Sequence, residues 1–199
     1  MTTPLVLTLP GWQGSGPEHW QSRWEARHGD TRVEQHDWMR PLRGDWTARL
    51  EEVVVAQPAP VLLAAHSLGC ILAAWWAAHS KHADRVAGAL LVAPPEIERD
   101  DLRQAIHGWA PPARQRLPFR ATLVASSDDP YGSLAYTSQL AVDWGADFVN
   151  LGPTGHINAE SGLGNWPEGR ALLTALGASG ATENIAVSAC PTSARGLFD

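Results

Sequence analysis

Short apolar runs closed by glycine or proline constrain the fold of this chain more than any other feature. Three such runs lie at Leu5–Leu9, Val61–Ala65 and Ala89–Ala93, and a later strand is predicted at Ala121–Ala125. A run that is apolar at successive positions suits a strand buried on both faces, as in a parallel sheet. A further strand is predicted at Asp147–Leu151.

Segments with helical spacing of apolar residues separate these strands. The predicted helices are Pro17–His28, Thr47–Ala56, Leu68–His79, Ser133–Trp144 and Pro167–Leu176. Strands that alternate with helices imply right-handed crossovers between parallel strands. The sequence therefore predicts the α/β class, with a doubly wound sheet of about six mainly parallel strands and helices on both faces.

Two segments fall outside this alternation. Pro94–Pro118 is rich in proline and follows a strand, so we interpret it as an insertion that forms a short, shallow cap. After Leu176 the chain is rich in alanine, serine and glycine and poor in large apolar residues. Because 199 residues suit one domain, we predict a single domain over 1–176 and a tail over 177–199.

Composition excludes several classes of function. The chain has 15 Lys and Arg against 21 Asp and Glu, so it lacks the positive field that nucleic acid or anionic lipid requires. The longest apolar run, Leu68–Ala78, is about half of the roughly 20 residues that cross a bilayer. We therefore expect a cytoplasmic protein without membrane or nucleic-acid partners. Cys70 and Cys190 are interpreted as unpaired thiols, and His79 and His82 as surface residues rather than metal ligands.

The pentapeptide Ala65-His66-Ser67-Leu68-Gly69 lies between a predicted strand and a predicted helix. This is the setting of a nucleophile elbow, G-x-S-x-G, with alanine in place of the first glycine. A helix that begins beside Ser67 directs its free N–H groups, that of Leu68 among them, to the place where an oxyanion would form. The alternative is that Ser67 is only a helix N-cap, a position that serine favours.

A nucleophilic serine needs a histidine as base and a carboxylate that orients the histidine. Asp128 and Asp129 follow the strand at Ala121–Ala125, and either could supply the carboxylate. His156 follows the next predicted strand within a glycine-containing loop, so it is the candidate base. The order serine, acid, histidine, with each residue just beyond a strand, predicts a catalytic triad.

Several segments together resemble a known family, the small α/β-hydrolase-fold serine hydrolases typified by retinoblastoma-binding protein nine. The likeness extends over roughly Leu5–Leu176 and is carried by Leu9–Pro17 with His19-Trp20, Val33–Gln35 with Asp37-Trp38, Ala65–Cys70, Ala89–Pro94, Ser127–Tyr131 and Gly155–Gly162. The resemblance implies that Ser67 is the nucleophile, Asp129 the acid and His156 the base. It also implies that the backbone N–H of Trp12 joins that of Leu68 in an oxyanion hole, although Pro10 stands where many α/β-hydrolases have histidine.

Ten tryptophans are more than a core of this size normally contains. Trp38, Trp109 and Trp166 lie in or beside the loops expected around the site, so they are candidate pocket residues. Gln13 and His66 are the other two candidates. The alternative for each tryptophan is packing, with the indole body buried and its N–H satisfied at the rim. Trp75 and Trp76, inside an alanine-rich helix, are expected in the core.

These observations predict a serine hydrolase that needs neither metal nor cofactor and acts on small carboxylic esters through an acyl-enzyme. Hydrolysis of thioesters or short peptides would use the same triad. A protein-interaction module that retains the hydrolase fold is the alternative from another class, because fold alone does not establish function.

Overall fold

The structure is a computed structural model that describes residues 5–178. Residues 179–199, which hold Cys190 and most of the predicted tail, lie outside the described part. The strands within it are β1 (Leu5–Leu9), β2 (Thr31–Arg32), β3 (Val61–His66), β4 (Val86–Val92), β5 (Ala121–Ala125) and β6 (Asp147–Asn150). The α-helices are α1 (Trp20–His28), α2 (Arg43–Val55), α3 (Leu68–His79), α4 (Asp100–Ala105), α5 (Leu134–Trp144) and α6 (Pro167–Ala178).

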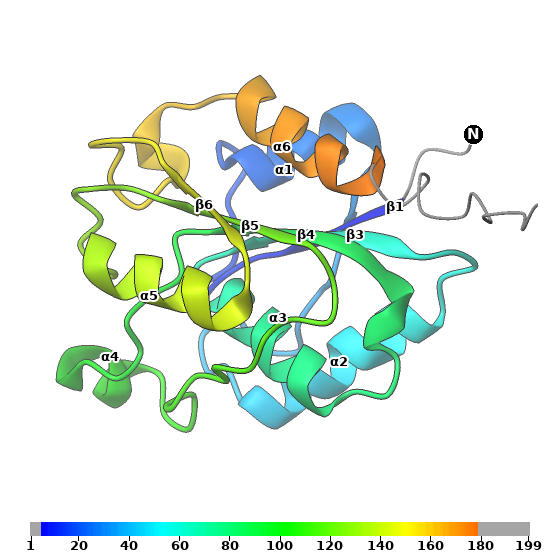
Figure 1. The fold of residues 1–199 in the computed structure, drawn as a ribbon, viewed down its shortest axis with the longest axis horizontal. Coiled ribbons are helices and arrows are strands. Elements are labelled where there is room, and N and C mark those ends of the chain that lie inside the picture. Colours follow the sequence, from blue (N-terminus) through cyan, green and yellow to red (C-terminus); the bar gives the residue numbers. More distant parts are fainter. Residues whose placement is uncertain (1–4, 179–199) are drawn as a thin grey trace, which may run out of the picture.

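Within this part of the chain the strands form one parallel sheet in the order β2-β1-β3-β4-β5-β6. Helices α1 and α6 cover one face, and α2, α3 and α5 cover the other (Figure 1). This confirms the predicted α/β architecture. Because all the strands run the same way, the loops that follow their carboxyl ends meet at one edge of the sheet, where ligands bind in open α/β folds.

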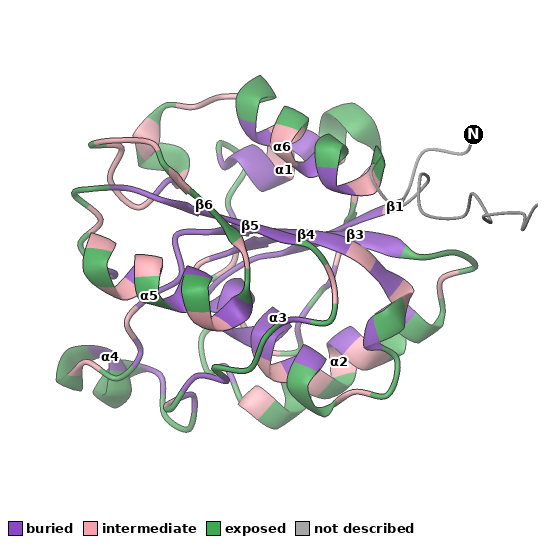
Figure 2. Ribbon diagram, in the orientation of Figure 1, coloured by how far each residue is buried: buried purple, intermediate pink, exposed green. Residues whose placement is uncertain are grey.

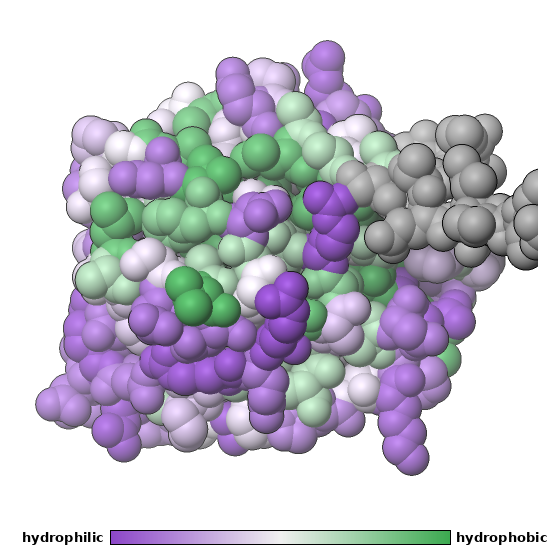
Figure 3. Space-filling model, in the orientation of Figure 1, coloured by the Kyte–Doolittle hydropathy of each residue, from purple (hydrophilic) through white to green (hydrophobic). Residues whose placement is uncertain are grey.

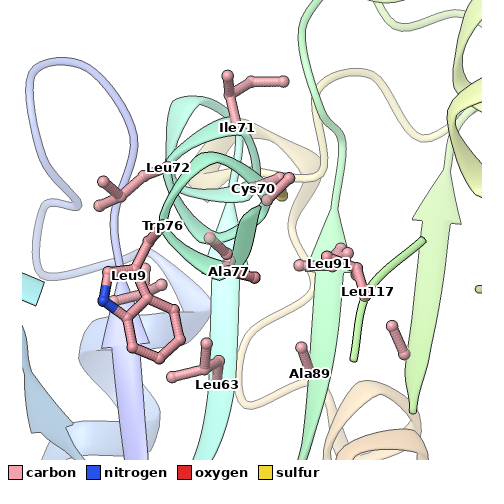
Figure 4. Packing of buried hydrophobic residues seen from close by; sticks show 14 of the residues in the cluster. Leu9, Leu63, Cys70, Ile71, Leu72, Trp76, Ala77, Ala89, Leu91 and Leu117 are labelled. Carbon is pink, nitrogen blue, oxygen red and sulfur yellow. The ribbon is translucent and has the colours of Figure 1, made fainter. Parts of the chain in front are cut away.

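The central strands are buried on both faces, as Figure 2 shows. Along β1, Leu7 and Leu9 join the cluster under α2 and α3, whereas Val6 joins the cluster under α1 and α6. Helix α3 packs over the middle of the sheet, where the side chain of Trp76 lies close to Leu63 (Figure 4). Alternate residues of each central strand thus face two separate apolar layers, which explains why the runs are apolar throughout.

Some element boundaries differ from those predicted. Helix α1 begins at Trp20 rather than Pro17, because the His19 side chain caps it by accepting a hydrogen bond from the Gln21 N–H (3.2 Å). Helix α2 begins at Arg43, ahead of its apolar periodicity. The short strand β2 was not predicted, since Thr31 and Arg32 carry no apolar signal.

The surface of the described residues is mixed in character. The face shown in Figure 3 has hydrophilic side chains gathered in its lower half, and hydrophobic residues are more frequent in the band above them. Large exposed apolar side chains are distributed over several elements, with Val142 on α5 the most exposed at 74%. None of the helices in residues 5–178 combines the length and the apolar character that a membrane span requires.

Candidate active site

The turn between β3 and α3 holds Ser67 in a strained backbone conformation. Its φ of 52° and ψ of −123° lie where residues other than glycine rarely occur. The Ser67 side chain makes no capping hydrogen bond to α3. Ser67 therefore stands at the N-cap position of α3 without capping the helix through its side chain, and its hydroxyl remains available to another partner.

Two glycines allow the chain to approach this turn closely. A Cβ atom on Gly69 would lie 2.1 Å from the carbonyl oxygen of Leu9, and one on Gly11 would lie 2.8 Å from the Cβ of Ser67. Ala65, which replaces the first glycine of the motif, is fully buried within β3. The close contacts thus fall on Gly69, the motif position that retains glycine, and on Gly11 in the loop after β1.

Ser67, His156 and Asp129 form one hydrogen-bonded row. The Nε2 atom of His156 lies 3.0 Å from the Ser67 Oγ, and its Nδ1 lies 2.9 Å from each carboxylate oxygen of Asp129. Because a carboxylate only accepts, Nδ1 carries the proton and Nε2 accepts from the serine hydroxyl. The Asp129 side chain is only 3% exposed and also accepts a hydrogen bond from the Tyr131 N–H.

Two side chains that follow β5, those of Ser126 and Asp128, hold the loop that carries His156. Ser126 Oγ accepts a hydrogen bond from the Thr154 N–H (2.9 Å), and Asp128 Oδ1 accepts one from the Gly155 N–H (2.7 Å). The hydroxyl of Ser126 also donates to Asp128 (2.7 Å), and these bonds lower the pKa of the Asp128 carboxyl. Asp128 therefore fixes the loop, while its neighbour Asp129 contacts the imidazole.

His66 provides a third support for this loop. Its Nε2–H donates to the carbonyl oxygen of His156 (2.9 Å), so residues 66 and 67 both bind residue 156. Burial lowers the pKa of His66 well below its ordinary value. Burial also lowers the pKa of His19, whose ring lies 4.6 Å from that of His66, to about 3. Both imidazoles are therefore neutral at neutral pH. The sequence did not indicate the support from Ser126, because this residue carries no motif of its own.

Trp12 and Leu68, whose backbone N–H groups are the candidates for the oxyanion hole, line the same cavity as Ser67 and His156. Within residues 5–178 neither group donates a hydrogen bond. Leu68 is the first residue of α3, where an N–H has no partner in its own helix. A Cβ on Gly11 would lie 3.2 Å from the Leu68 nitrogen, so the loop containing Trp12 packs directly on the start of α3.

A cavity of about 350 Å³ opens at Ser67. Gln13 and His66 line it, as predicted, but Trp38, Trp109 and Trp166 do not. Trp109 is fully buried and donates from Nε1 to the Pro41 carbonyl, and Trp38 packs edge-on against Trp46. Trp166 is buried against Trp20. These three predictions were wrong because the indoles of Trp109 and Trp166 fill the interior beside the loops, and the half-buried indole of Trp38 packs on Trp46.

A larger open hollow, of about 630 Å³, lies at the far end of α3 from Ser67. There the guanidinium of Arg43 lies 3.6 Å from the ring centroid of Trp75, and the His79 ring stacks on the same indole. Trp75 is therefore half-buried at the surface, which corrects its expected place in the core, whereas Trp76 is buried as predicted. The Glu51 carboxylate in this hollow accepts hydrogen bonds from Trp76 and Ser80, so internal contacts occupy it.

Comparison with known proteins places this chain in a family. Residues 6–175 match the family model described as Serine hydrolase. A YdeN-like hydrolase from Pectobacterium atrosepticum has a similar structure, with a TM-score of 0.77, 29% identity and coverage of 89% of this chain and 92% of that one. No curated protein matches the chain at a significant level.

More distant structures share the fold. The ydeN gene product of Bacillus subtilis superposes with a TM-score of 0.70 at 19% identity, covering 87% of this chain and 98% of that one. The monoacylglycerol lipase of Paleococcus ferrophilus does so with a TM-score of 0.63 at 11% identity, covering 89% and 96%. Since the family match spans most of its length, the chain belongs to the serine hydrolase family and is a hydrolase with the α/β-hydrolase fold.

Proposed function

We propose that this hydrolase is a carboxylesterase that uses Ser67, Asp129 and His156 as its catalytic triad. The observation that carries the proposal is the single hydrogen-bonded row from the Ser67 hydroxyl through His156 to a buried carboxylate. Such a row gives a weakly nucleophilic hydroxyl a base and gives the resulting imidazolium a counter-charge. We also propose that the chain is a relative of retinoblastoma-binding protein nine. This resemblance assigns the same three residues to the triad.

Acylation follows from the geometry. The Ser67 oxygen forms a bond to the ester carbonyl carbon while His156 Nε2 takes the hydroxyl proton. The carbonyl oxygen becomes an oxyanion that the N–H groups of Trp12 and Leu68 hold. The bond from carbon to the alcohol oxygen then breaks, and His156 returns its proton to that oxygen. The alcohol leaves, and the acyl group remains on Ser67.

Deacylation reverses the roles. A water molecule gives one proton to His156 Nε2 as its oxygen attacks the acyl carbon. The bond from that carbon to the Ser67 oxygen breaks, and His156 returns the proton to serine. The products are one carboxylic acid and one alcohol per ester, with the enzyme unchanged. A cavity of about 350 Å³ lies at the small end of the range for ligand sites, which supports small acyl groups.

Covalent labelling tests the proposal directly. A fluorophosphonate probe should modify Ser67, as identified by mass spectrometry of the labelled peptide, and hydrolysis of p-nitrophenyl butyrate should disappear with labelling. Hydrolysis of thioesters or short peptides at a much higher kcat/KM than of esters would keep the triad and change the substrate class. Absence of both labelling and turnover would instead favour an interaction module that retains the fold.

A further inference from the structure

The cavity at Ser67 has two walls of different chemistry. Apolar side chains form one wall: Leu102 lies on α4, Ile106 follows that helix, and Pro95 follows β4. Polar groups form the other, with Asn158 and Glu160 on the loop that carries His156. In Figure 1 α4 lies on the side of the sheet covered by α3 and α5, and the loop before α6, in yellow to orange, lies on the side of α1. The two walls therefore come from opposite faces of the sheet.

The chemistry of proton transfer indicates which wall faces the alcohol of the ester and which faces the acyl chain. His156 must return its proton to the leaving alcohol oxygen, so this oxygen lies next to Nε2 when the bond breaks. The alcohol consequently extends along the loop that carries His156, past Asn158 and Glu160. The acyl chain, on the other side of the carbonyl carbon, lies against Leu102 and Ile106.

The polar wall is also the open one. A second hollow, of about 580 Å³, shares Tyr131, His156, Asn158 and Glu160 with the catalytic cavity and continues to Pro153 and Ser161. On the apolar wall, the side chains of Leu102 and Ile106 are buried. The alcohol side thus has space for a larger group than the acyl side.

The charged side chain that lines the catalytic cavity is negative. Glu160 is the only carboxylate among the residues that line it, and no lysine or arginine lines it. His19 and His66 supply no compensating positive charge, since burial lowers the pKa of each. The Glu160 carboxylate is exposed and makes no hydrogen bond or ion pair within residues 5–178, so no internal partner occupies it.

We propose that the enzyme selects esters of a short apolar acid with a cationic alcohol, and that Glu160 is the residue that selects the alcohol by its charge. This inference rests on the proposed function. It implies that esters and thioesters with anionic leaving groups, such as acyl groups carried on phosphate-bearing thiols, are poor substrates. The selection acts through Coulomb attraction between Glu160 and the alcohol. Solvent exposure weakens this attraction, and added salt screens it.

Three butyrate esters with alcohols of similar size test the charge selection. Choline provides the cation, 3,3-dimethylbutanol the uncharged group of the same shape, and a hydroxyalkyl sulfonate the anion. We expect kcat/KM for the choline ester to exceed that for the sulfonate ester by about tenfold at low ionic strength, and this ratio to fall as salt is added. Glu160→Gln should bring the ratio close to one.

Two further variants separate Glu160 from general effects. Glu168→Gln removes an exposed carboxylate from the first turn of α6, outside the cavity, and should keep the wild-type ratio. Ile106→Trp narrows the apolar wall, so it should lower kcat/KM for p-nitrophenyl hexanoate far more than for the acetate while the charge ratio persists.

An unchanged ratio in Glu160→Gln, or equal loss in Glu168→Gln, would overturn the assignment of Glu160. If Ile106→Trp alters the charge ratio and leaves the acyl-length preference intact, the assignment of the acyl chain and the alcohol to the two walls would be reversed. Failure of the proposed function is distinguishable from both results, because the wild-type enzyme would then hydrolyse none of the esters and Ser67 would take no fluorophosphonate.

Discussion

Residue 67 shows how one strained position prepares chemistry. The elbow keeps the Ser67 side chain out of the capping bond and places its hydroxyl 3.0 Å from His156 Nε2. Strain of this kind costs of the order of 1–3 kcal/mol and persists only where the surroundings impose it. Here the surroundings are the close approaches of Gly11 and Gly69 to the turn.

Ser67→Ala should abolish hydrolysis of short p-nitrophenyl esters, lowering kcat by about 10⁴-fold or more, because the attacking oxygen is lost. His156→Ala should have a similar effect. Since the two groups act as a unit, the double variant should be little worse than either single variant. Steady-state kinetics with the melting temperature as a folding control measures this, and near wild-type turnover in Ser67→Ala would refute the mechanism.

Neighbouring aspartates should respond differently to amide substitution. Asp129→Asn should lower kcat by about 10³- to 10⁴-fold, because an amide that donates to Nδ1 stabilises the wrong tautomer of His156. Asp128→Asn retains an oxygen that can accept from the Gly155 N–H, so its loss should be far smaller. Initial rates over a pH range measure both, and a reversed ranking would move the acid to Asp128.

At the scale of elements, the junction of β1, β3 and α3 depends on contact between backbones. Helix α3 starts so near the end of β1 that only hydrogen fits at position 69, where a Cβ would lie 2.1 Å from the Leu9 oxygen. The same junction carries Trp12 and Leu68, whose N–H groups we assign to the oxyanion. Packing of α3 therefore sets both the stability of the sheet and the geometry of the site.

Gly69→Ala should consequently destabilise the fold by at least about 2 kcal/mol, since α3 must move to relieve the overlap. Gly44→Ala is the matched control: this glycine lies within α2 and a Cβ there would meet nothing within 4 Å. That substitution should be neutral or stabilise by up to about 1 kcal/mol. Urea denaturation of both variants provides the comparison, and equal stabilities would contradict the role given to Gly69.

Across the whole molecule, buried neutral histidines should make the fold sensitive to acid. The pKa of His19 falls from 6.5 to about 3 on burial, and that of His66 falls in the same direction. Below pH 6.5 the unfolded chain binds protons that the folded chain does not, so stability is lost as pH falls. Each of these histidines should cost about 1.4 kcal/mol per pH unit below this value, down to its folded pKa.

His19→Asn removes one of these titrating groups and keeps a side chain that caps α1 well. The free energy of unfolding should therefore fall less steeply between pH 6.5 and 4 in this variant than in the wild type. Urea denaturation at several pH values gives the two slopes. Parallel slopes would show that His19 is not held neutral in the folded protein.

Truncation after Ser179 tests the predicted domain boundary. The family match ends at residue 175, and from 177 to 199 the only large apolar residues are Ile185, Val187, Leu197 and Phe198. The truncated protein should keep its esterase activity and melting temperature, because so few apolar side chains bury little area. A melting temperature lower by several degrees would show that the tail contributes to the fold.

The sequence by itself determined the buried central strands, the elbow and the order of the candidate site residues along the chain, but not the short edge strand β2. Burial on both faces requires unbroken apolar runs, and a nucleophile elbow requires glycine at the close approaches, so both leave local signals at Leu5–Leu9 and Ala65–Gly69. His156 could also be identified as the candidate base from the sequence, because it follows a predicted strand within a loop that contains glycine.

The tertiary structure decided which side chains meet. Nothing local distinguishes Asp128 from Asp129 as the partner of His156, and only resemblance favoured Asp129; the folded loops place one against Gly155 and the other against the imidazole. Trp109 and Trp166 fill the interior because distant segments enclose them. Side-chain direction in loops depends on packing between residues far apart in the chain, and no short stretch of sequence encodes it.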